Sequence, residues 1–295
     1  MVSLPNVGRA AAASHRLFLW ILVYPSIWVA AAIASLVPFV QSTLGLAFDW
    51  APVLLIFAIG LIPYNIDRIA DSYFQEIPDP QAQNYFRQGW GWGILTLATV
   101  ATAILLYRAN QQVVMVSLAG LIPFIYGLPI FPWRGRDRWQ WFRLKDVPAT
   151  KAWIVTSVIT YAVIAVPLAY AEQPFTLSAG ITSLFLLIFV GTNSHLFDVR
   201  DLQSDRQAGV QTLPSLVGVT GNRRIWFGLN GLALGVVAWG WMQSLRVPDP
   251  AIALPCIAVN IIALCLIKPT TPRSVYSILI DGYLFLPAAI AAVFR

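Results

Sequence analysis

The stretch NSHLFDVRDLQSDRQAGVQTLP, from Asn193 to Pro214, decides the fold of this 295-residue chain. It follows a long apolar run and carries three aspartates, Asp198, Asp201 and Asp205. Spacings of three and four residues place all three carboxylates on one face of a helix. Because three neighbouring anions repel one another, the pattern predicts a bound cation. Mg²⁺ fits best, since it prefers oxygen ligands and often shares its coordination shell with phosphates.

The residues between and after these aspartates extend the prediction. Arg200 and Arg206 are interleaved with the carboxylates, and a guanidinium group is a good ligand for phosphate. Gly209 ends the helical pattern, and Pro214 opens the next segment. The motif is therefore expected to be a short acidic helix that leads into a new helix.

The composition places this motif in a membrane protein. Hydrophobic residues make up 58% of the chain and charged residues 11%, with a mean hydropathy of +0.70. Soluble domains average about 25% charged residues. The net charge of +6 does not by itself indicate a nucleic-acid partner, because in a membrane protein the placement of charge along the chain matters more. No nucleic acid is expected among its partners.

Nine apolar runs are long enough to cross a bilayer, which takes about 20 residues per helix. The fold class predicted from them is all-α, a polytopic bundle of nine transmembrane helices that forms a single domain over residues 1–295. The runs are Leu17–Phe39, Leu46–Tyr64, Gly89–Tyr107, Val113–Phe131, Ala152–Tyr170, Leu177–Phe197, Ile225–Ser244, Pro250–Ile267 and Val275–Phe294.

The basic residues predict the orientation of these spans. With nine spans, all 19 lysines and arginines except Arg108, Arg246 and Arg295 lie on one side of the membrane. Short cytoplasmic loops carry an excess of Lys and Arg. The N-terminus and the aspartate motif are therefore expected on the cytoplasmic side of an integral, multi-pass protein.

A second acidic segment follows the second span, on the same side of the membrane. Asp67 and Asp71 are four residues apart and share a face if the helix continues, with Arg68 beside them. Acidic segments after spans two and six suggest a repeat in which spans 1–4 and 5–8 correspond and a ninth helix is added. Carboxylates from both halves are expected to hold two Mg²⁺ ions with a diphosphate between them.

The loop from Pro132 to Lys151 is basic and rich in tryptophan. A positive cytoplasmic loop with interfacial aromatic residues is the favoured interpretation for any one of its residues. In the alternative, some of Arg143, Lys145 and Lys151 reach the diphosphate. Mg²⁺ and these cations would neutralise a diphosphate as it leaves an allylic carbon, and the apolar helices would enclose an isoprenoid tail.

The stretch from Asp198 to Gly218 resembles the second aspartate motif of the UbiA-type membrane prenyltransferases. That motif reads roughly D-x-x-D-x-x-x-D, then an arginine, a glycine and a T-L-P or S-L-P ending, and Arg206, Gly209 and Thr212–Pro214 match it. The family has nine helices with motifs after helices 2 and 6. The resemblance implies Mg²⁺-dependent transfer of an isoprenyl group from a prenyl diphosphate to a lipophilic acceptor, such as an aromatic quinone precursor or a tetrapyrrole.

The resemblance also implies roles for individual residues. Five aspartates would hold Mg²⁺ and form the catalytic centre, and three basic residues would bind the diphosphate. The aspartates are Asp67, Asp71, Asp198, Asp201 and Asp205, and the basic residues are Arg68, Lys151 and Arg206.

The first motif departs from the family pattern N-D-x-x-D-x-x-x-D. Asp67 and Asp71 match its last two aspartates, but Pro63 and Tyr64 stand where Asn-Asp is usual. The basic segment that usually follows is replaced by SYFQEIPDPQAQ, with Glu76 and Asp79. Two alternatives stay open: a catalytically degenerate relative that binds a lipid or partner, and a transporter.

Two further polar residues lie in apolar runs. Asp281 is inside the ninth span, where an unpaired carboxylate is costly. It is either functional or hydrogen-bonded to a neighbouring helix, for example at Asn230 or Asn260. His195 could line the site, but a histidine that packs between helices is the favoured interpretation.

Overall fold

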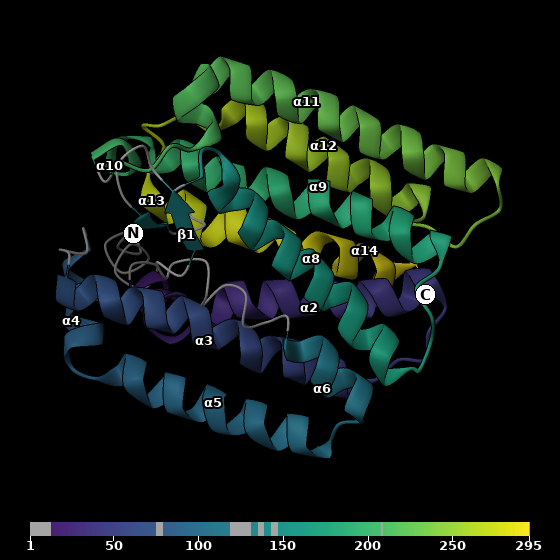
Figure 1. The fold of residues 1–295 in the computed structure, drawn as a ribbon, viewed down its shortest axis with the longest axis horizontal. Helices are drawn as coiled ribbons and strands as arrows, with labels where there is room; N and C mark the ends of the chain where they lie inside the picture. The colour runs from purple at the N-terminus through teal and green to yellow at the C-terminus, as the bar shows by residue number, and fades with distance from the viewer. Residues whose placement is uncertain are drawn as a thin grey trace, which may run out of the picture.

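The computed structural model describes residues 13–74, 79–118, 131–134, 139–142, 147–207 and 209–294. Figure 1 shows an elongated bundle of long helices that run roughly side by side. In this part of the chain the strands are β1 (Phe131–Arg134) and β2 (Trp139–Phe142), an antiparallel pair with Phe131 opposite Phe142. The predicted all-α class is confirmed, with this small hairpin as an addition.

Seven helices in the described part are long and apolar enough to cross a membrane. Many large apolar side chains on them are exposed, including Leu97, Leu232 and Leu279, as expected for surfaces that face lipid. The protein is therefore an integral, multi-pass membrane protein. The seven candidate spans are Ile27–Leu44, Trp50–Tyr73, Trp90–Arg108, Thr150–Tyr170, Leu177–Arg200, Leu213–Met242 and Arg273–Val293.

Two of the nine predicted spans do not reach this length among the described residues. The eighth is α12 (Pro250–Leu266), an apolar helix of 17 residues. The fourth begins as α6 (Gln111–Ser117), and residues 119–130 lie outside the described part. Its predicted end at Phe131 is wrong, because Phe131 already belongs to β1.

The first predicted span, Leu17–Phe39, is not one continuous helix. A short π-helical segment, Leu19–Val23, is separated from α2 (Ile27–Leu44) by a break at Pro25 and Ser26. Proline lacks a backbone N–H, and Ser26 takes a left-handed conformation with φ of 61°. The Nδ2 group of Asn65 donates to the carbonyl of Pro25 at 3.0 Å, so the helix that begins at Trp50 stabilises the break.

The bundle has two groups of helices (Figure 1). The first comprises α2, α3 (Trp50–Phe74) and α5 (Trp90–Arg108), and α6 packs on the helix that begins at Thr150. The second comprises α8 (Thr150–Tyr170), α9 (Leu177–Arg200), α11 (Leu213–Met242) and α12, and α14 (Leu286–Val293) packs on both α2 and α12. The predicted repeat of spans 1–4 and 5–8 stays a prediction.

Aromatic rings join the two groups in the core. Phe39 of α2 lies 6.1 Å from Phe185 of α9, and Phe185 stacks on Phe189 at the same centroid distance. All three side chains are fully buried. Aromatic pairs at this spacing add about 0.5–1.5 kcal/mol beyond the burial of their area. The first group is therefore held directly against the acidic helix α9.

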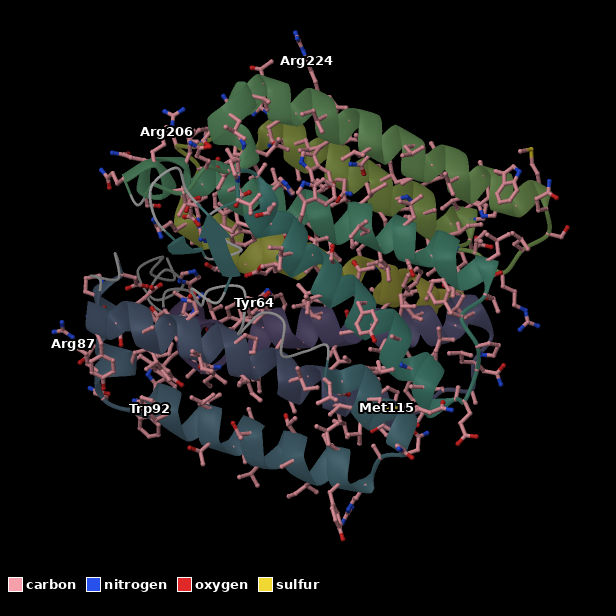
Figure 2. All side chains as sticks on the ribbon, viewed as in Figure 1. Tyr64, Arg87, Trp92, Met115, Arg206 and Arg224 are labelled. Atoms are coloured by element: carbon pink, nitrogen blue, oxygen red, sulfur yellow. The ribbon has the colours of Figure 1, made fainter. Side chains whose placement is uncertain are left out.

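One end of the bundle collects the short polar helices. Figure 1 places α4 (Pro80–Arg87), α10 (Leu202–Gln207) and α13 (Arg273–Val275) there. Figure 2 shows that Arg87 and Arg206 project outward from the same end. Because α8 begins at this end, Lys151 in its first turn is brought to the acidic motifs.

Two glycines shape the chain after the motif. Gly209 has φ of 73° and follows α10, which ends at Gln207, as the sequence predicts. Gly218 has φ of 72° and ψ of 166°, so α11 is two helical pieces joined by a kink. Glycine adopts positive φ without the steric penalty of a Cβ atom. The first piece, which begins at Leu213, therefore points in a different direction from the longer piece after Gly218.

Candidate active site

The three aspartates of the main motif lie at a helix junction, and the continuous helix expected from their spacing is interrupted there. Asp198 belongs to the last turn of α9, Asp201 follows as its C-cap, and Asp205 belongs to α10. The backbone N–H of Asp205 still donates to the carbonyl of Asp201 at 2.8 Å, so the near-helical spacing is retained. Asp198 and Asp205 are buried, with 4% and 7% of their surface exposed.

Lys151 neutralises part of this cluster. Its ammonium donates to Oδ1 of Asp205 at 3.0 Å, and it also interacts electrostatically with Asp198 and Asp201. The backbone N–H of Ala149 donates to the carbonyl of Gln211 at 2.7 Å and ties the start of α8 to the loop after α10. The structure therefore brings Lys151 to all three aspartates, and the diphosphate role expected for it stays a prediction.

Arg200 forms a bidentate ion pair with its neighbour Asp201. Nε donates to Oδ1 at 2.8 Å and Nη2 donates to Oδ2 at 2.7 Å. The guanidinium also lies over the rings of Phe197 and Tyr276, with centroid distances of 4.7 and 5.6 Å. Fork-shaped Arg–carboxylate pairs are the strong ones. Arg200 is thus fixed by α9 and by the last span together.

The first acidic segment lies on α3, which continues to Phe74, so Asp67, Arg68 and Asp71 share one helix as predicted. Asp67 is exposed, whereas Arg68 and Asp71 are partly buried. Asp71 interacts electrostatically with Asp201 and Lys151. Charged groups of the two halves therefore come within interaction range of one another.

Asp281 of the last span joins the same group of charges. It interacts electrostatically with Arg68 and Arg200. Its proposed partners Asn230 and Asn260 instead bond to each other: Asn260 Nδ2 donates to Asn230 Oδ1 at 2.8 Å. Both amides also donate to the hydroxyl of Thr192. The two asparagines thus form a separate polar network in the second half.

The cluster has an excess of negative charge. Six carboxylates interact with three cations, which leaves a formal charge of −3 if all the groups are ionised. Among the described residues, no three Asp, Glu, His or Cys side chains lie close enough to form a ready-made metal site. The anions are Asp67, Asp71, Asp198, Asp201, Asp205 and Asp281, and the cations are Arg68, Lys151 and Arg200.

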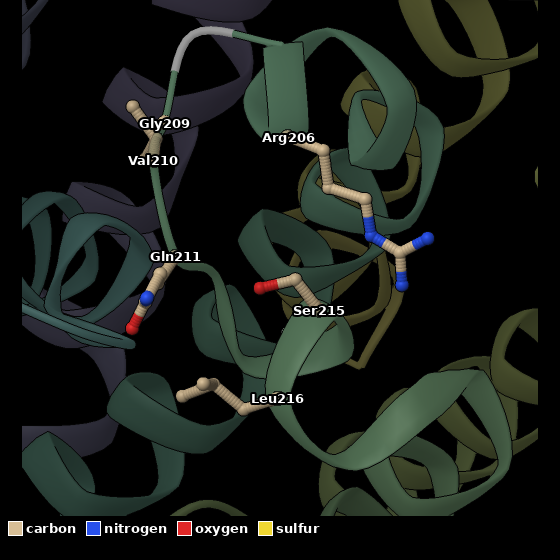
Figure 3. A pocket seen from close by; sticks show the side chains of 6 residues that line it. All are labelled: Arg206, Gly209, Val210, Gln211, Ser215 and Leu216. Atoms are coloured by element: carbon tan, nitrogen blue, oxygen red, sulfur yellow. The ribbon is translucent and has the colours of Figure 1, made fainter.

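Arg206 lies apart from this cluster. Its side chain is exposed and lines a surface pocket of about 290 Å³ beside the start of α11. Figure 3 shows the pocket between Arg206, Ser215, Leu216 and the segment from Gly209 to Gln211. The diphosphate role predicted for Arg206 stays a prediction, and the structure brings Lys151 and Arg68, but not Arg206, into the charge cluster.

The other charged residues noted in the sequence lie outside the charge cluster or outside the described residues. Arg143, Lys145 and Glu76 lie outside the described residues. Asp79 caps α4 by accepting from the N–H of Gln81 at 2.9 Å, and it also accepts from the hydroxyl of Tyr24. Its role is therefore to hold α4.

His195 packs between aromatic rings one turn before Asp198. Its ring is fully buried, 4.4 Å from Trp226 and 5.3 Å from Trp153. Nδ1 lies 2.9 Å from the carbonyl of Gly191. These contacts agree with the packing role favoured from the sequence.

Two site features were not assigned from the sequence. The bidentate pairing of Arg200 with Asp201 needs side-chain geometry, although the adjacent opposite charges are a visible signal. The approach of Asp281 to Arg68 and Arg200 joins residues far apart in the chain. A carboxylate within an apolar run is its only signal in the sequence.

Comparison with known proteins agrees with this architecture. Neither a family profile nor a curated protein sequence matches the chain. Among solved structures, a UbiA homologue from Archaeoglobus fulgidus bound to GPP and Mg²⁺ has a TM-score of 0.64 at 14% identity, over 93% of this chain and 99% of that one. A UbiA homologue from Aeropyrum pernix K1 has a TM-score of 0.60 at 12% identity, over 93% and 99%.

A structure of digeranylgeranylglyceryl phosphate synthase is also similar, with a TM-score of 0.55 at 13% identity, over 94% of this chain and 95% of that one. At these identities the likeness establishes the fold. The resemblance of the Asp198–Gly218 stretch to UbiA-type proteins is thus confirmed at the level of architecture, and the chain has the UbiA fold.

Proposed function

We propose that the protein transfers an isoprenyl group from a prenyl diphosphate to a lipophilic acceptor in the membrane, with Mg²⁺ as cofactor. The observation that carries the proposal is the acidic cluster, in which Asp71 of α3 interacts electrostatically with Asp201 at the end of α9 and with Lys151 of α8. A diphosphate is polyanionic and would be repelled by a cluster that is itself negative. Two Mg²⁺ ions would reverse the sign of the cluster's charge, which makes diphosphate binding possible.

The donor atoms present are of the kind that such a cation binds, although no three of the described Asp, Glu, His or Cys side chains already lie at metal-binding distance from one another. Asp205 Oδ2 is buried and makes no hydrogen bond, so an acceptor oxygen is free to bind a metal. Asp198 is buried beside it, among groups that include Lys151. Oxygen-only donors of this kind suit Mg²⁺. Asp198, Asp201 and Asp205 would hold one ion, with Asp201 shared with Arg200, and Asp67 and Asp71 would hold the other.

The protein's own basic groups would bind and orient the diphosphate. Lys151 and Arg68 lie within the cluster, whereas Arg206 lies apart from it, at the surface pocket beside the start of α11. When bound, Mg²⁺ would help to neutralise the charge that develops on the leaving diphosphate. The apolar helices would hold the isoprenoid tail and keep water from the allylic carbon. An electron-rich acceptor, an aromatic quinone precursor or a tetrapyrrole, would then attack that carbon.

The structural neighbours support this chemistry. UbiA homologues from Archaeoglobus fulgidus are bound to GPP and Mg²⁺ in one structure and to DMAPP and Mg²⁺ in another. The distribution of basic residues supports a cytoplasmic position for the N-terminus and for both acidic segments. We therefore propose that diphosphate enters from the cytoplasmic side.

The proposal is tested with the purified protein in nanodiscs. It is incubated with radiolabelled prenyl diphosphates of different length and with a panel of quinone precursors and tetrapyrroles, with and without EDTA. We expect a labelled lipophilic product with Mg²⁺ and none with EDTA. A product that forms equally well in EDTA contradicts the metal-dependent mechanism.

One observation favours a second candidate, a catalytically degenerate relative that binds a lipid or partner. Pro63 and Tyr64 stand where the first motif usually has Asn-Asp, and the neighbouring Asn65 is buried, with hydrogen bonds from its amide to the carbonyls of Pro25 and Leu61. If Mg²⁺ and a prenyl diphosphate raise the melting temperature together but no acceptor is alkylated, this candidate holds. The transporter alternative gains no support, because the carboxylates of the two acidic segments interact with each other and α10, which carries Asp205, lies at one end of the bundle.

A further inference from the structure

The surface pocket of about 290 Å³ beside the start of α11 lies apart from the charge cluster. Arg206 lines this pocket with an exposed side chain, and within the described part of the chain its guanidinium enters no hydrogen bond or ion pair. Figure 3 shows the Gln211 amide on the other side, with the Ser215 hydroxyl between the two in this view. The pocket thus offers a cation and a neutral amide donor, a combination that suits a phosphate group.

The apolar surface next to the pocket indicates that the phosphate belongs to a lipid. Leu216 and Val217 follow Ser215 on the first piece of α11, and 50% and 44% of their surface is exposed. The kink at Gly218 turns this piece away from the longer one, at the end of the bundle where Figure 1 places α10. Exposed apolar side chains beside a cation are expected where lipid headgroups border the acyl chains.

The charge of the surrounding membrane fits the same ligand. The cytoplasmic leaflet carries anionic lipids, and basic pockets at the ends of membrane helices bind their headgroups. An anionic phospholipid has, in one molecule, a phosphate for Arg206 and acyl chains for Leu216 and Val217. A free phosphate ion would leave both apolar side chains uncovered.

Backbone hydrogen bonds join the pocket to the charge cluster. The N–H of Val210 donates to the carbonyl of Asp205 at 2.8 Å. The carbonyl of Gln211 accepts from the N–H of Ala149 at 2.7 Å. Asp205 is ion-paired with Lys151, two residues after Ala149. A lipid that contacts Val210 and Gln211 would therefore support the segment that holds this ion pair in place.

We propose that the pocket binds the headgroup phosphate of an anionic phospholipid, with Arg206 on the phosphate and Leu216 and Val217 along the acyl chains. The pocket is then a lipid site separate from the site of the prenyl diphosphate. Binding at this pocket requires no prenyl transfer, so it is measured independently of the proposed function.

The test measures the affinity of the first lipid that stays bound to the purified full-length protein in native mass spectrometry. Dioleoylphosphatidylglycerol and dioleoylphosphatidylcholine are compared in the same detergent, and we expect the anionic lipid to bind at least about tenfold more tightly. Arg206→Gln should weaken its binding about tenfold. Ser215→Leu, which narrows the pocket and keeps its charge, should weaken it about fivefold.

The control is Arg224→Gln, at an exposed arginine of α11 that projects outward in Figure 2 and does not line the pocket. It should change the affinity for the anionic lipid by less than about twofold. Equal affinities for the two lipids in the wild type, or a preference that persists in Arg206→Gln, overturn the inference.

Competition identifies the occupant of the pocket. Neither inorganic phosphate nor geranyl diphosphate with Mg²⁺ should release the bound anionic lipid. Release by inorganic phosphate would assign the pocket to the free ion, and release by geranyl diphosphate would assign it to the substrate, so either result contradicts the lipid site. The proposed function is judged separately, by the labelled transfer product, and survives a failure of this inference.

Discussion

Lys151 and Asp205 form an ion pair with a nitrogen–oxygen distance of 3.0 Å, and this pair connects the first turn of α8 to the short helix α10. The pair is partly buried, since 36% of the lysine side chain and 10% of the aspartate side chain are exposed. The second oxygen of Asp205 has no hydrogen-bond partner. The ammonium of Lys151 thus neutralises only part of the negative charge of the acidic cluster.

Replacing Lys151 is expected to make the metal-free protein less stable. Lys151→Met leaves Asp205 buried beside Asp198 without its cation, at a cost of about 1–2 kcal/mol after allowance for solvent at the exposed lysine. The melting temperature in EDTA should fall, and the rise produced by Mg²⁺ should be larger than in the wild type. Differential scanning fluorimetry in detergent measures both.

The control for this variant is Lys268→Met, at an exposed lysine in the connection between α12 and α13. It should melt like the wild type in EDTA and respond normally to Mg²⁺. If Lys151→Met is as stable as the wild type without metal, the ion pair contributes nothing to the cluster, and our description of its charge balance is wrong.

The buried network of the second half is expected to serve stability alone. Asn260→Leu leaves the amide oxygen of Asn230 without its donor, and a hydrogen bond between membrane helices contributes about 0.6 kcal/mol on average and up to about 1.7. We expect a lower melting temperature and an unchanged KM for prenyl diphosphate. Ile262→Ala, at an exposed position on the same helix, is the control. A raised KM in Asn260→Leu would place this network in the substrate site.

Arg206 and Arg68 are expected to differ in their effect on substrate binding. Arg206 is exposed at a surface pocket, whereas Arg68 interacts with Asp67, Asp71 and Asp281. Arg68→Gln should therefore raise the KM for prenyl diphosphate more than Arg206→Gln does. Steady-state kinetics over a range of diphosphate concentrations provide the comparison. Equal effects would mean that the outer pocket also contacts the substrate.

Much of the architecture could be predicted because the length of an apolar run and the residues that begin or end a helix are local properties of the sequence. Gly209 adopts a positive φ and follows the acidic helix, and Pro214 lies in the first turn of α11, where the fixed φ of proline suits a helix start. The break at Pro25 was missed because apolar length alone does not reveal it. The break is stabilised by Asn65 of another helix, whose Nδ2 group donates a hydrogen bond to the carbonyl of Pro25.

The site was predictable where charge spacing within one segment decided it. The spacing from Asp198 to Asp205 put these side chains near one another, and Lys151 does reach them. The outward direction of Arg206 could not be predicted, because α10 is a separate short helix after Asp201. The place of Asp281 depends on a π-turn and on packing between both halves, which no local pattern encodes.

The central claim is that both halves of the bundle contribute carboxylates to shared Mg²⁺ ions, and calorimetric titration of Mg²⁺ in the presence of geranyl thiolodiphosphate tests it most directly. Asp71→Asn in α3 and Asp198→Asn in α9 should each weaken Mg²⁺ binding by at least about tenfold, whereas Asp249→Asn, at the exposed cap of α12, should not. If Asp71→Asn binds Mg²⁺ as tightly as the wild type, the first half does not share the metal site and the claim is contradicted.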